Sequence, residues 1–227
     1  MSEINSNNKT SKSEQTKKKI VNAYLDLISS KKWDKITVKE ICLHAAITRG
    51  TFYQYYFDIY DLMEQIEATL LDDLNHRYSL AIKEKSPVYS IELFEEKFDY
   101  APPRMLNTWF KFCRKYKKEV AVLLDPKNGD TYFVKKLKII IGQHINQMMN
   151  DDGIPTDALR SHFSKLFVEM HFLAARSWLE SAPDEFLSIT DIVNLLNTMR
   201  VGASYLHYRQ LTTPDFDIKM NIPDDID

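Results

Sequence analysis

The chain has 227 residues, 44% of them hydrophobic, which is enough for one small and one larger domain, each with its own core. Only 5 Gly and 8 Pro occur, and few segments alternate like a half-buried strand, so we expect an all-α fold rather than a β-rich one. The formal net charge of −2 hides an asymmetry, because residues 1–60 hold 10 Lys and Arg against 6 Asp and Glu, whereas residues 61–227 hold 20 against 26. Binding to a polyanion is therefore expected at the N-terminal end.

The N-terminal segment, residues 1–12, is polar, and we expect it to be a disordered arm. Its Lys9 and Lys12 leave open a second role, as a basic arm that reaches a DNA backbone. The segment lacks the hydrophobic stretch of a signal peptide, and no apolar run of about 18 residues occurs in the chain. Cys42 and Cys113 show no spacing typical of a disulfide framework. These features predict a cytoplasmic protein that does not enter a membrane.

The first helix is expected over residues 13–30, where apolar residues recur at helical spacing on one face. These residues are Ile20, Tyr24, Leu27 and Ile28. Trp33 follows shortly after the helix, and we expect its ring to complete a small N-terminal core.

Residues 37–62 then predict two very short helices joined by a tight turn and followed by a long third helix. Thr37 with Glu40 forms a capping box, and apolar residues follow at i, i+3, i+4 and i+7. Thr48 is expected to cap the second helix, and Asp58 the third. Such a short pair is typical of a helix-turn-helix that lays one helix in the DNA major groove.

The order of residues in this segment resembles the DNA-binding domain of the TetR family of bacterial transcriptional regulators. The resemblance rests on Thr37, Ile41, Ala45, Ala46, Ile47, Thr48, Gly50, Thr51, Phe52, Tyr53, Tyr55, Tyr56, Asp58 and Leu62. Two positions depart from the family pattern. Ala46 replaces the usual turn glycine, which means strain if its φ is positive. Ile59 replaces a lysine, so the phosphate contact that the resemblance implies is not carried over, and restoring the lysine is predicted to tighten DNA binding.

The resemblance implies an N-terminal helix-turn-helix domain at residues 13–60 and a helical ligand-binding and dimerisation domain at residues 61–211. An acidic tail at residues 212–227 has no evident partner. We expect a sequence-specific transcriptional regulator, most simply a repressor that binds an inverted-repeat operator in double-stranded DNA as a homodimer in the bacterial cytoplasm. The resemblance further implies that a small apolar or amphipathic effector releases the DNA.

In the second short helix, Arg49 and Thr51 are expected at base edges, because the Arg fork suits guanine and the Thr methyl suits thymine. Gln54 is a further candidate, for adenine. Hydroxyl groups and the start of the first short helix are assigned to phosphates. The predicted DNA-binding set is Thr37, Lys39, Thr48, Arg49, Gly50, Thr51, Tyr53, Gln54 and Tyr55. As alternatives, Tyr53 packs into the core, and the capping threonines act only as caps.

The third helix is expected to run from residue 58 to about residue 83 and to enter the second domain. Prolines bracket a short helix between residues 87 and 103, and one longer helix should then extend as far as Asp125. Further helices are expected around residues 133–148, 156–181 and 189–211.

The last two helices have apolar arcs wider than one core stripe requires. In the TetR resemblance these helices form a four-helix interface with the second subunit, and the arcs supply its surface. The residues predicted for the interface are Phe163, Phe167, Met170, Ala174, Trp178, Leu196, Met199, Ala203 and Leu206. The alternative is that both helices lie in the centre of a monomeric core.

The resemblance and an aromatic, Met-rich set of residues together predict an effector pocket in the second domain. The predicted lining is Trp109, Phe112, Tyr116, His144, Met148, Phe167, Met170 and His171. The alternative is ordinary core packing, since aromatic and Met stripes at helical spacing usually lie in a core.

No pattern in the chain points to catalysis, a cofactor or a metal. His144, His162 and His171 lack the spacing of metal ligands, and no glycine-rich phosphate loop or nucleophile elbow occurs. The basic run at residues 114–118 is more typical of a solvated helix face than of a second nucleic-acid site. Two other functions stay open: an interaction module that has lost DNA binding, and a helical-bundle enzyme.

Overall fold

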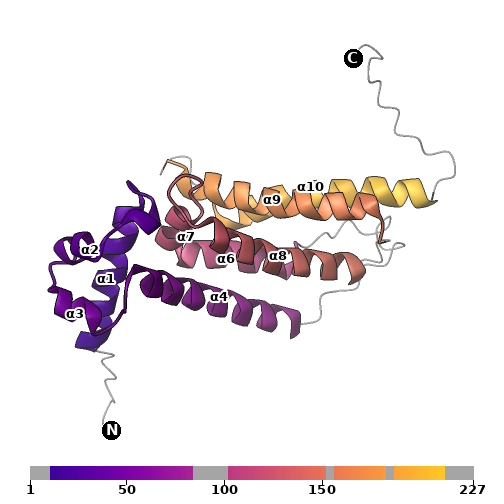
Figure 1. The fold of residues 1–227 in the computed structure, drawn as a ribbon. Helices are drawn as coiled ribbons and strands as arrows, with labels where there is room; N and C mark the ends of the chain where they lie inside the picture. The colour runs from indigo at the N-terminus through magenta and orange to yellow at the C-terminus, as the bar shows by residue number, and fades with distance from the viewer. Residues whose placement is uncertain (1–10, 84–101, 152–155, 183–186, 213–227) are drawn as a thin grey trace, which may run out of the picture.

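The computed structural model describes residues 11–83, 102–151, 156–182 and 187–212. Every regular element in these ranges is helical, so the prediction of an all-α fold is confirmed. A small N-terminal head sits at one end of a bundle of helices (Figure 1).

The head contains α1 (Lys12–Ile28), the 3-10 turn η1 (Trp33–Lys35), α2 (Val38–His44) and α3 (Arg49–Tyr53). Helix α1 begins where Ser11 and Glu14 form a reciprocal capping box, which satisfies backbone donors at its first turn. The helices enclose a small apolar core whose central side chains are fully buried. These include Ile20, Tyr24, Ile28, Ile41 and Phe52.

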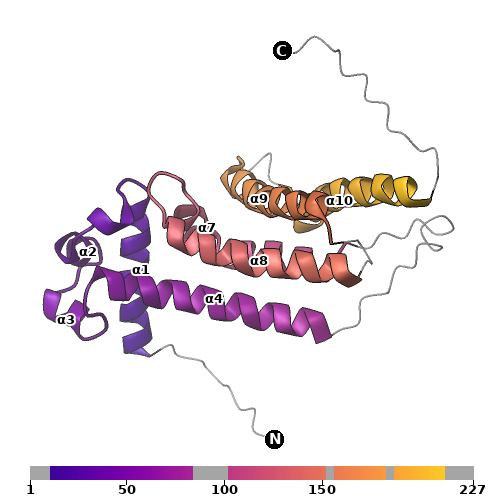
Figure 2. The same ribbon diagram turned by 45° about the vertical axis from the view of Figure 1, so that its right-hand side comes forward.

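Helix α4 (Ile59–Lys83) belongs to both the head and the body. It leaves the head and runs along one side of the bundle (Figure 2). It begins as predicted at Asp58, whose Oδ1 accepts hydrogen bonds from the backbone N–H groups of Tyr60 (2.8 Å) and Asp61 (2.9 Å). One buried stripe along it supplies both cores: Leu62, Met63, Ile66, Leu70, Leu74 and Tyr78.

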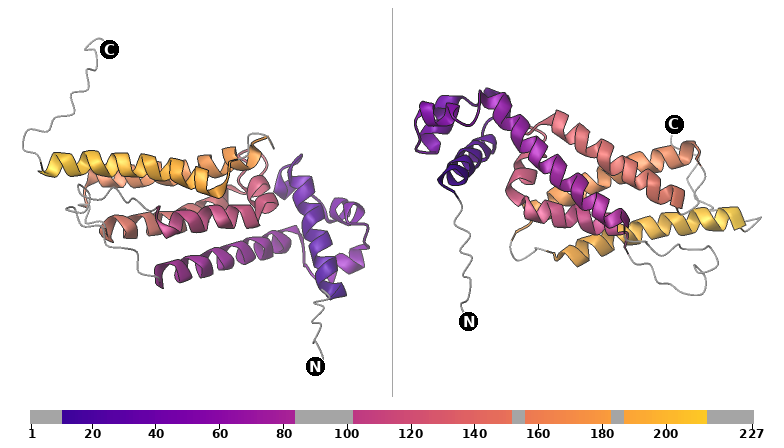
Figure 3. Two further views of the ribbon diagram at one scale, coloured as in Figure 1. Left: turned by 180° about the vertical axis from the view of Figure 1, so that it is seen from behind. Right: turned by 90° about the horizontal axis from the view of Figure 1, so that it is seen from below.

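The body stacks its helices in three layers (Figures 1 and 3). Helix α4 forms one outer layer. Helices α6 (Arg104–Lys115) and α8 (Thr131–Asp151) lie in the middle, and α9 (Ala158–Glu180) and α10 (Ile189–Thr212) form the other outer layer. The core between them is rich in aromatic residues with no exposed surface, namely Trp109, Phe110, Phe112 and Phe133.

The single helix expected up to Asp125 is instead divided into α6 and α7 (Lys117–Leu123). The break falls at Tyr116, where φ is −110° and ψ is 39°, and no proline or glycine marks it in the sequence. The bend brings α7 against α1. Lys118 Nζ there forms an ion pair with Asp26 (2.8 Å) and donates to the carbonyl of Asn22 (3.2 Å). The body thereby holds the first helix of the head.

The other predicted helices lie within a few residues of their expected bounds. Residues 1–10, most of the bracketed segment between residues 87 and 103, and residues 213–227 lie outside the described residues. In the part of the chain that is described, no helix combines the length and the apolar character needed to cross a membrane.

Candidate DNA-binding interface

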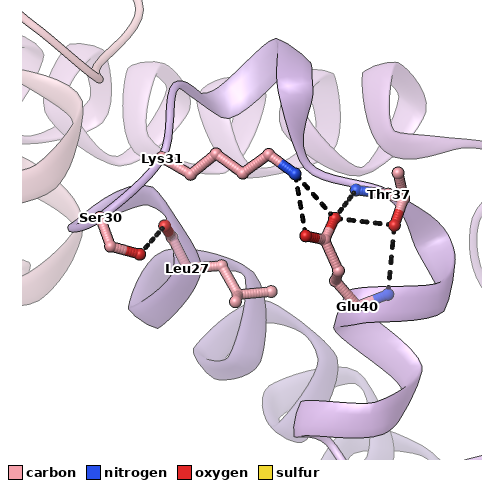
Figure 4. Close-up of polar contacts among 5 residues, drawn as sticks. All are labelled: Leu27, Ser30, Lys31, Thr37 and Glu40. Atoms are coloured by element: carbon pink, nitrogen blue, oxygen red, sulfur yellow. Dashed lines mark hydrogen bonds and ion pairs between the residues drawn. The ribbon is translucent and has the colours of Figure 1, made fainter.

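The first helix of the helix-turn-helix, α2, begins with a capping box formed by Thr37 and Glu40, and Lys31 adds a third contact to Glu40 (Figure 4). Glu40 N–H donates to Thr37 Oγ1 (3.3 Å), and Glu40 Oε2 accepts from Thr37 N–H (2.8 Å). Lys31 Nζ, just beyond the end of α1, lies 2.8 Å from Glu40 Oε1. These contacts, Lys31 first, lower the pKa of Glu40 to about 2. The start of α2 is therefore fixed to α1 by a charge-assisted bridge.

The turn between α2 and α3 is a Schellman motif. Ile47 N–H donates to Cys42 O (3.0 Å), and Ala46 N–H donates to Leu43 O (3.3 Å). The motif requires a left-handed residue at its centre, and Ala46 has φ of 52°. The substitution of the usual glycine thus places a Cβ in a conformation that disfavours one, and the strain considered from the sequence is present.

Helix α3 is only five residues long, and its two ends are fixed by different means. Thr48 Oγ1 accepts from Thr51 N–H (3.1 Å), and the two threonine hydroxyls lie 2.9 Å apart. Phe52 is fully buried and anchors the other side, in contact with the ring of Tyr56. The side chains opposite Phe52 consequently point away from the head.

Most of the predicted DNA-binding residues are exposed. Thr51 and Tyr55 are half-buried, and the exposed members are Thr37, Lys39, Thr48, Arg49, Gly50, Tyr53 and Gln54. Tyr53 is 56% exposed, which contradicts the alternative that it packs into the core. The capping threonines cap their helices and still face solvent, so capping leaves room for a phosphate contact.

Ile59 is different, because its side chain is only 9% exposed and belongs to the hydrophobic core. This burial argues against the expectation that a lysine here would tighten DNA binding. A lysine would lose the apolar packing of Ile59 and would have to extend out of the core to keep its charge solvated.

A contact between α1 and Tyr55, two residues beyond the end of α3, was not foreseen from the sequence. Lys17 Nζ lies 5.8 Å from the centre of the Tyr55 ring, and Lys12, Lys18 and Lys19 on the same helix are exposed. The only signal in the sequence was the lysine run itself. It places positive charge beside the helix-turn-helix.

The residues predicted for a subunit interface fall into three groups. Phe167, Trp178 and Leu196 are at most 3% exposed and fill the core of their own subunit, so they cannot provide a surface. Met199 is 49% exposed, whereas Phe163, Met170 and Ala174 are half-buried. Side chains from residue 203 onwards, including Ala203 and Leu206, are not described. Other apolar side chains on the outer layer are exposed, namely Leu166, Leu173 and Leu195.

The body contains a cavity of about 20 Å³, which has room for roughly one water molecule. Its lining is Tyr78, Pro103, Met105, Leu106, Ile141, His144, Ile145, Met148, Phe167, His171 and Arg200. Four of the eight predicted pocket residues are among them. Trp109 and Phe112 pack in the core and do not line it, nor does half-buried Tyr116, while Met170 lines a separate open groove beside α8 and α9.

Both histidines of the cavity lose basicity through burial. Burial lowers the pKa of His171 to about 4, although its Nδ1 lies 2.7 Å from the carbonyl oxygen of Phe167. Burial also lowers the pKa of His144, whose ring lies 4.3 Å from that of Tyr78. At neutral pH, His171 is therefore an uncharged hydrogen-bonding group in an apolar wall.

A capped helix-turn-helix joined to a helical bundle through one shared helix defines a class of two-part, all-helical folds. The fold is that of TetR-family transcriptional regulators. A TetR transcriptional regulator from Streptococcus agalactiae 2603V is similar with a TM-score of 0.53 and 19% identity, over 82% of this chain and 94% of that one. The fatty acid degradation regulator FadR from Bacillus halodurans is similar with a TM-score of 0.58 and 14% identity, over 82% of this chain and 95% of that one.

A candidate TetR-family regulator from Syntrophomonas wolfei str. Goettingen gives a TM-score of 0.53 and 13% identity, over 85% of this chain and 96% of that one. No protein-family model and no curated protein matches the sequence. At these identities the likeness establishes a shared fold, and it confirms the TetR resemblance at that level.

Proposed function

We propose that this protein is a sequence-specific DNA-binding transcriptional regulator of the TetR type. The observation that carries the proposal is α3, which is capped by Thr48, anchored by Phe52 and turned outward with Arg49 and Gln54 exposed. A rigid short helix with a cation and an amide on its free face suits the major groove, where Arg reads guanine and Gln reads adenine. The similarity to solved regulators supports the same function.

The other residues of the interface take positioning roles in this proposal. Thr37 and Lys39 at the start of α2 bind one phosphate, and the free N–H groups of that helix turn add to the attraction. Tyr53 and Tyr55 bind further phosphates through their hydroxyl groups. If the Thr51 hydroxyl donates to Thr48, the Thr48 hydroxyl keeps its own hydrogen for a phosphate.

The experiment is a selection of bound sequences from a random DNA pool, followed by titration of the enriched site by fluorescence anisotropy at several salt concentrations. We expect an inverted repeat, a strong preference over scrambled DNA, and an affinity that falls steeply with salt. Absence of any enriched sequence, with equal weak binding to all DNA, would contradict the proposal.

We further propose that the protein acts as a homodimer through the outer layer of α9 and α10. Leu166 and Leu173 on α9 and Leu195 and Met199 on α10 are each 49–66% exposed, and large apolar side chains gathered on one layer are typical of an interface. Two linked heads would bind two half-sites about one helical turn apart.

An effector that releases the DNA is the third part of the proposal, and with it the role of a repressor. The cavity around His144, Met148 and His171 supports it, because a mostly apolar wall with a few polar groups, the Arg200 guanidinium among them, suits an apolar or amphipathic ligand. Since the cavity holds about one water molecule, a ligand must bind an opened form, and it shifts the equilibrium only by its preference for that form. Thermal-shift screening with amphipathic compounds, followed by DNA titration with each hit, tests this part.

A further inference from the structure

The head and the body meet at a small group of ionisable side chains that the proposed DNA-binding function does not use. It consists of Tyr24 from α1, Asp34 from η1, Glu67 from α4, and Asp130 and Lys136 from the start of α8. We call this group the junction cluster. Tyr24, Glu67 and Asp130 are at most 7% exposed, so three of the five members are closed off from water.

The loop between α7 and α8 brings the body side of the cluster into place. Asp125 Oδ1 accepts from the N–H groups of Lys127 (2.8 Å) and Asn128 (2.6 Å), which folds the loop tightly. A Cβ on Gly129 would lie 2.4 Å from Leu123 O, so only glycine fits at this point. The loop then presents Asn128 O to the N–H of Trp33 in the head, at 3.1 Å.

Asp130, which follows Gly129 in this loop, both caps α8 and interacts with Glu67 of α4. Its Oδ1 caps α8 by accepting from Tyr132 N–H (2.7 Å). Its carboxyl group also lies close enough to Glu67 to raise the pKa of that residue, and Glu67 Oε2 lies 2.8 Å from Lys136 Nζ. Two buried carboxyl groups therefore lie near each other with one ion-paired lysine, Lys136 on Glu67, and the proximity of two carboxyl groups in a buried site favours a proton on one of them.

The surroundings of Glu67 oppose its ionisation. Burial raises its pKa to about 7, Asp130 adds to the effect, and Lys136 opposes it. The head contributes Tyr24. Burial raises the pKa of its hydroxyl, and the negative charges of Asp130, Asp34 and Glu67 raise it further, so Tyr24 is electrostatically linked to these carboxyl groups. Asp34 Oδ1 is buried without a hydrogen-bond partner, and Asp34 Oδ2 lies 3.7 Å from Lys32.

We propose that the junction cluster is a proton-dependent clasp, in which a proton on buried Glu67 keeps the α7–α8 loop docked against Tyr24 and Trp33 of the head. When this proton leaves, the buried carboxylates of Glu67 and Asp130 lie together with Lys136 as the cation paired with Glu67, and the docked arrangement becomes less favourable. The protein without DNA should show this behaviour. Only its effect on operator binding rests on the proposed function.

The Trp33 amide reports the docked state directly, because its hydrogen bond to Asn128 O breaks when the head separates from the loop. The experiment measures hydrogen exchange at this amide by NMR between pH 6 and pH 8 at constant ionic strength, in the full chain without DNA. Glu67→Gln keeps the shape and stays neutral, so it serves as the reference at each pH and cancels the intrinsic pH dependence of exchange.

We expect the protection of the wild-type Trp33 amide, relative to Glu67→Gln, to fall by up to about tenfold between pH 6 and pH 8. This follows if the Glu67 carboxyl titrates near 7 when docked and near its ordinary value when undocked. Glu64→Gln, on an exposed site of the same helix, should leave the wild-type response unchanged. A constant ratio between the wild type and Glu67→Gln across this range would overturn the proposal.

A second pair of variants tests the role of the lysine. Lys136→Gln removes the cation that favours ionised Glu67, so the midpoint of the response should move to higher pH, whereas Lys135→Gln, which is exposed, should not move it. An unchanged midpoint in Lys136→Gln would contradict the clasp. The 13C chemical shift of the Glu67 carboxyl gives an independent measurement of its titration. A titration midpoint of this carboxyl below pH 5.5 in the wild type would also overturn the proposal.

Discussion

Ile47 donates its backbone N–H to the carbonyl of Cys42 at 3.0 Å, and this bond closes the turn that sets the angle between the two short helices of the head. The bond can form only because the intervening Ala46 takes a left-handed conformation, with φ of 52°. The geometry of the reading helix therefore depends on a residue that is strained where it stands.

Ala46→Gly should relieve this strain. A left-handed alanine costs roughly 1 kcal/mol or more, while glycine loses about 0.5–1 kcal/mol of backbone entropy on folding, so the variant should be neutral to about 1 kcal/mol more stable. Urea unfolding measures the difference. The matched control is Ala45→Gly, because Ala45 has φ of −79° and should lose about 0.5–1 kcal/mol. Equal losses in both variants would argue against strain at Ala46.

The bridge from Lys31 to Glu40 predicts an acid-sensitive head. Because the pKa of Glu40 is lowered in the folded protein, its contribution is complete above the ordinary pKa near 4.5 and is lost as the pH falls towards 2. Glu40→Gln should flatten the loss of stability over this range, while Glu64→Gln, on an exposed site, should not. Chemical denaturation at a series of acid pH values provides the measurement, and the effect should be modest because the bridge is exposed.

Arg49 and Tyr53 should separate base reading from phosphate binding. Arg49→Ala is expected to cost about 1–3 kcal/mol of operator binding and to relax the preference at one base pair of each half-site. Tyr53→Phe removes only a hydroxyl and should weaken binding to all sequences alike. Titrations against the selected site and its single-base variants check both. If Arg49→Ala keeps the full sequence preference, Arg49 does not read a base.

Gly50 should be more costly to replace for DNA binding than for folding. A Cβ at this position would meet only Thr48 Oγ1, at 3.7 Å, and alanine favours a helix more than glycine does. Gly50→Ala should therefore stabilise the free protein by about 0.5–1 kcal/mol. If the DNA backbone approaches α3 here, the added methyl should weaken operator binding about tenfold, near 1.4 kcal/mol. Unchanged affinity would place the DNA further away.

Leu195→Glu should convert the proposed dimer into monomers that still fold, because the side chain is 49% exposed in the single subunit. Light scattering of the purified protein measures the effect. Ile139→Glu, at an exposed apolar site on α8 outside the proposed interface, is the matched control and should remain dimeric. Leu196→Glu is not informative, since it would bury a charge in the subunit core and unfold the chain. A wild-type protein that is monomeric at micromolar concentration contradicts the interface.

The head could be predicted in detail because its signals are local. The caps formed by Thr37, Thr48 and Asp58 involve residues two or three positions apart, and the spacing of apolar residues identifies the buried faces. The burial of Ile59 was missed, since the family pattern suggested a backbone-facing position and did not report which neighbours surround it in this chain.

The body was harder to predict because its determinants are contacts between distant segments. Periodicity identifies an apolar arc but not whether the same chain covers it, which is why Phe167 and Leu196 were assigned to an interface although they fill the core. The break at Tyr116 carries no proline or glycine signal. The pairing of Glu67 with Asp130 joins residues more than sixty positions apart, and no local pattern encodes it.

The shared helix α4 has a consequence for how the molecule holds together. The ring of Tyr60, at the start of α4, packs edge-to-face against Trp33 of the head, and Glu67, two turns later, acts electrostatically on Tyr24. One side of the head is therefore formed by the same helix that lines the body. A fragment ending at residue 60 would lose this packing and expose the face of α1 that α4 covers. We therefore expect the two halves to melt as one cooperative unit, and an excised or exchanged half to need α4 with it in order to fold.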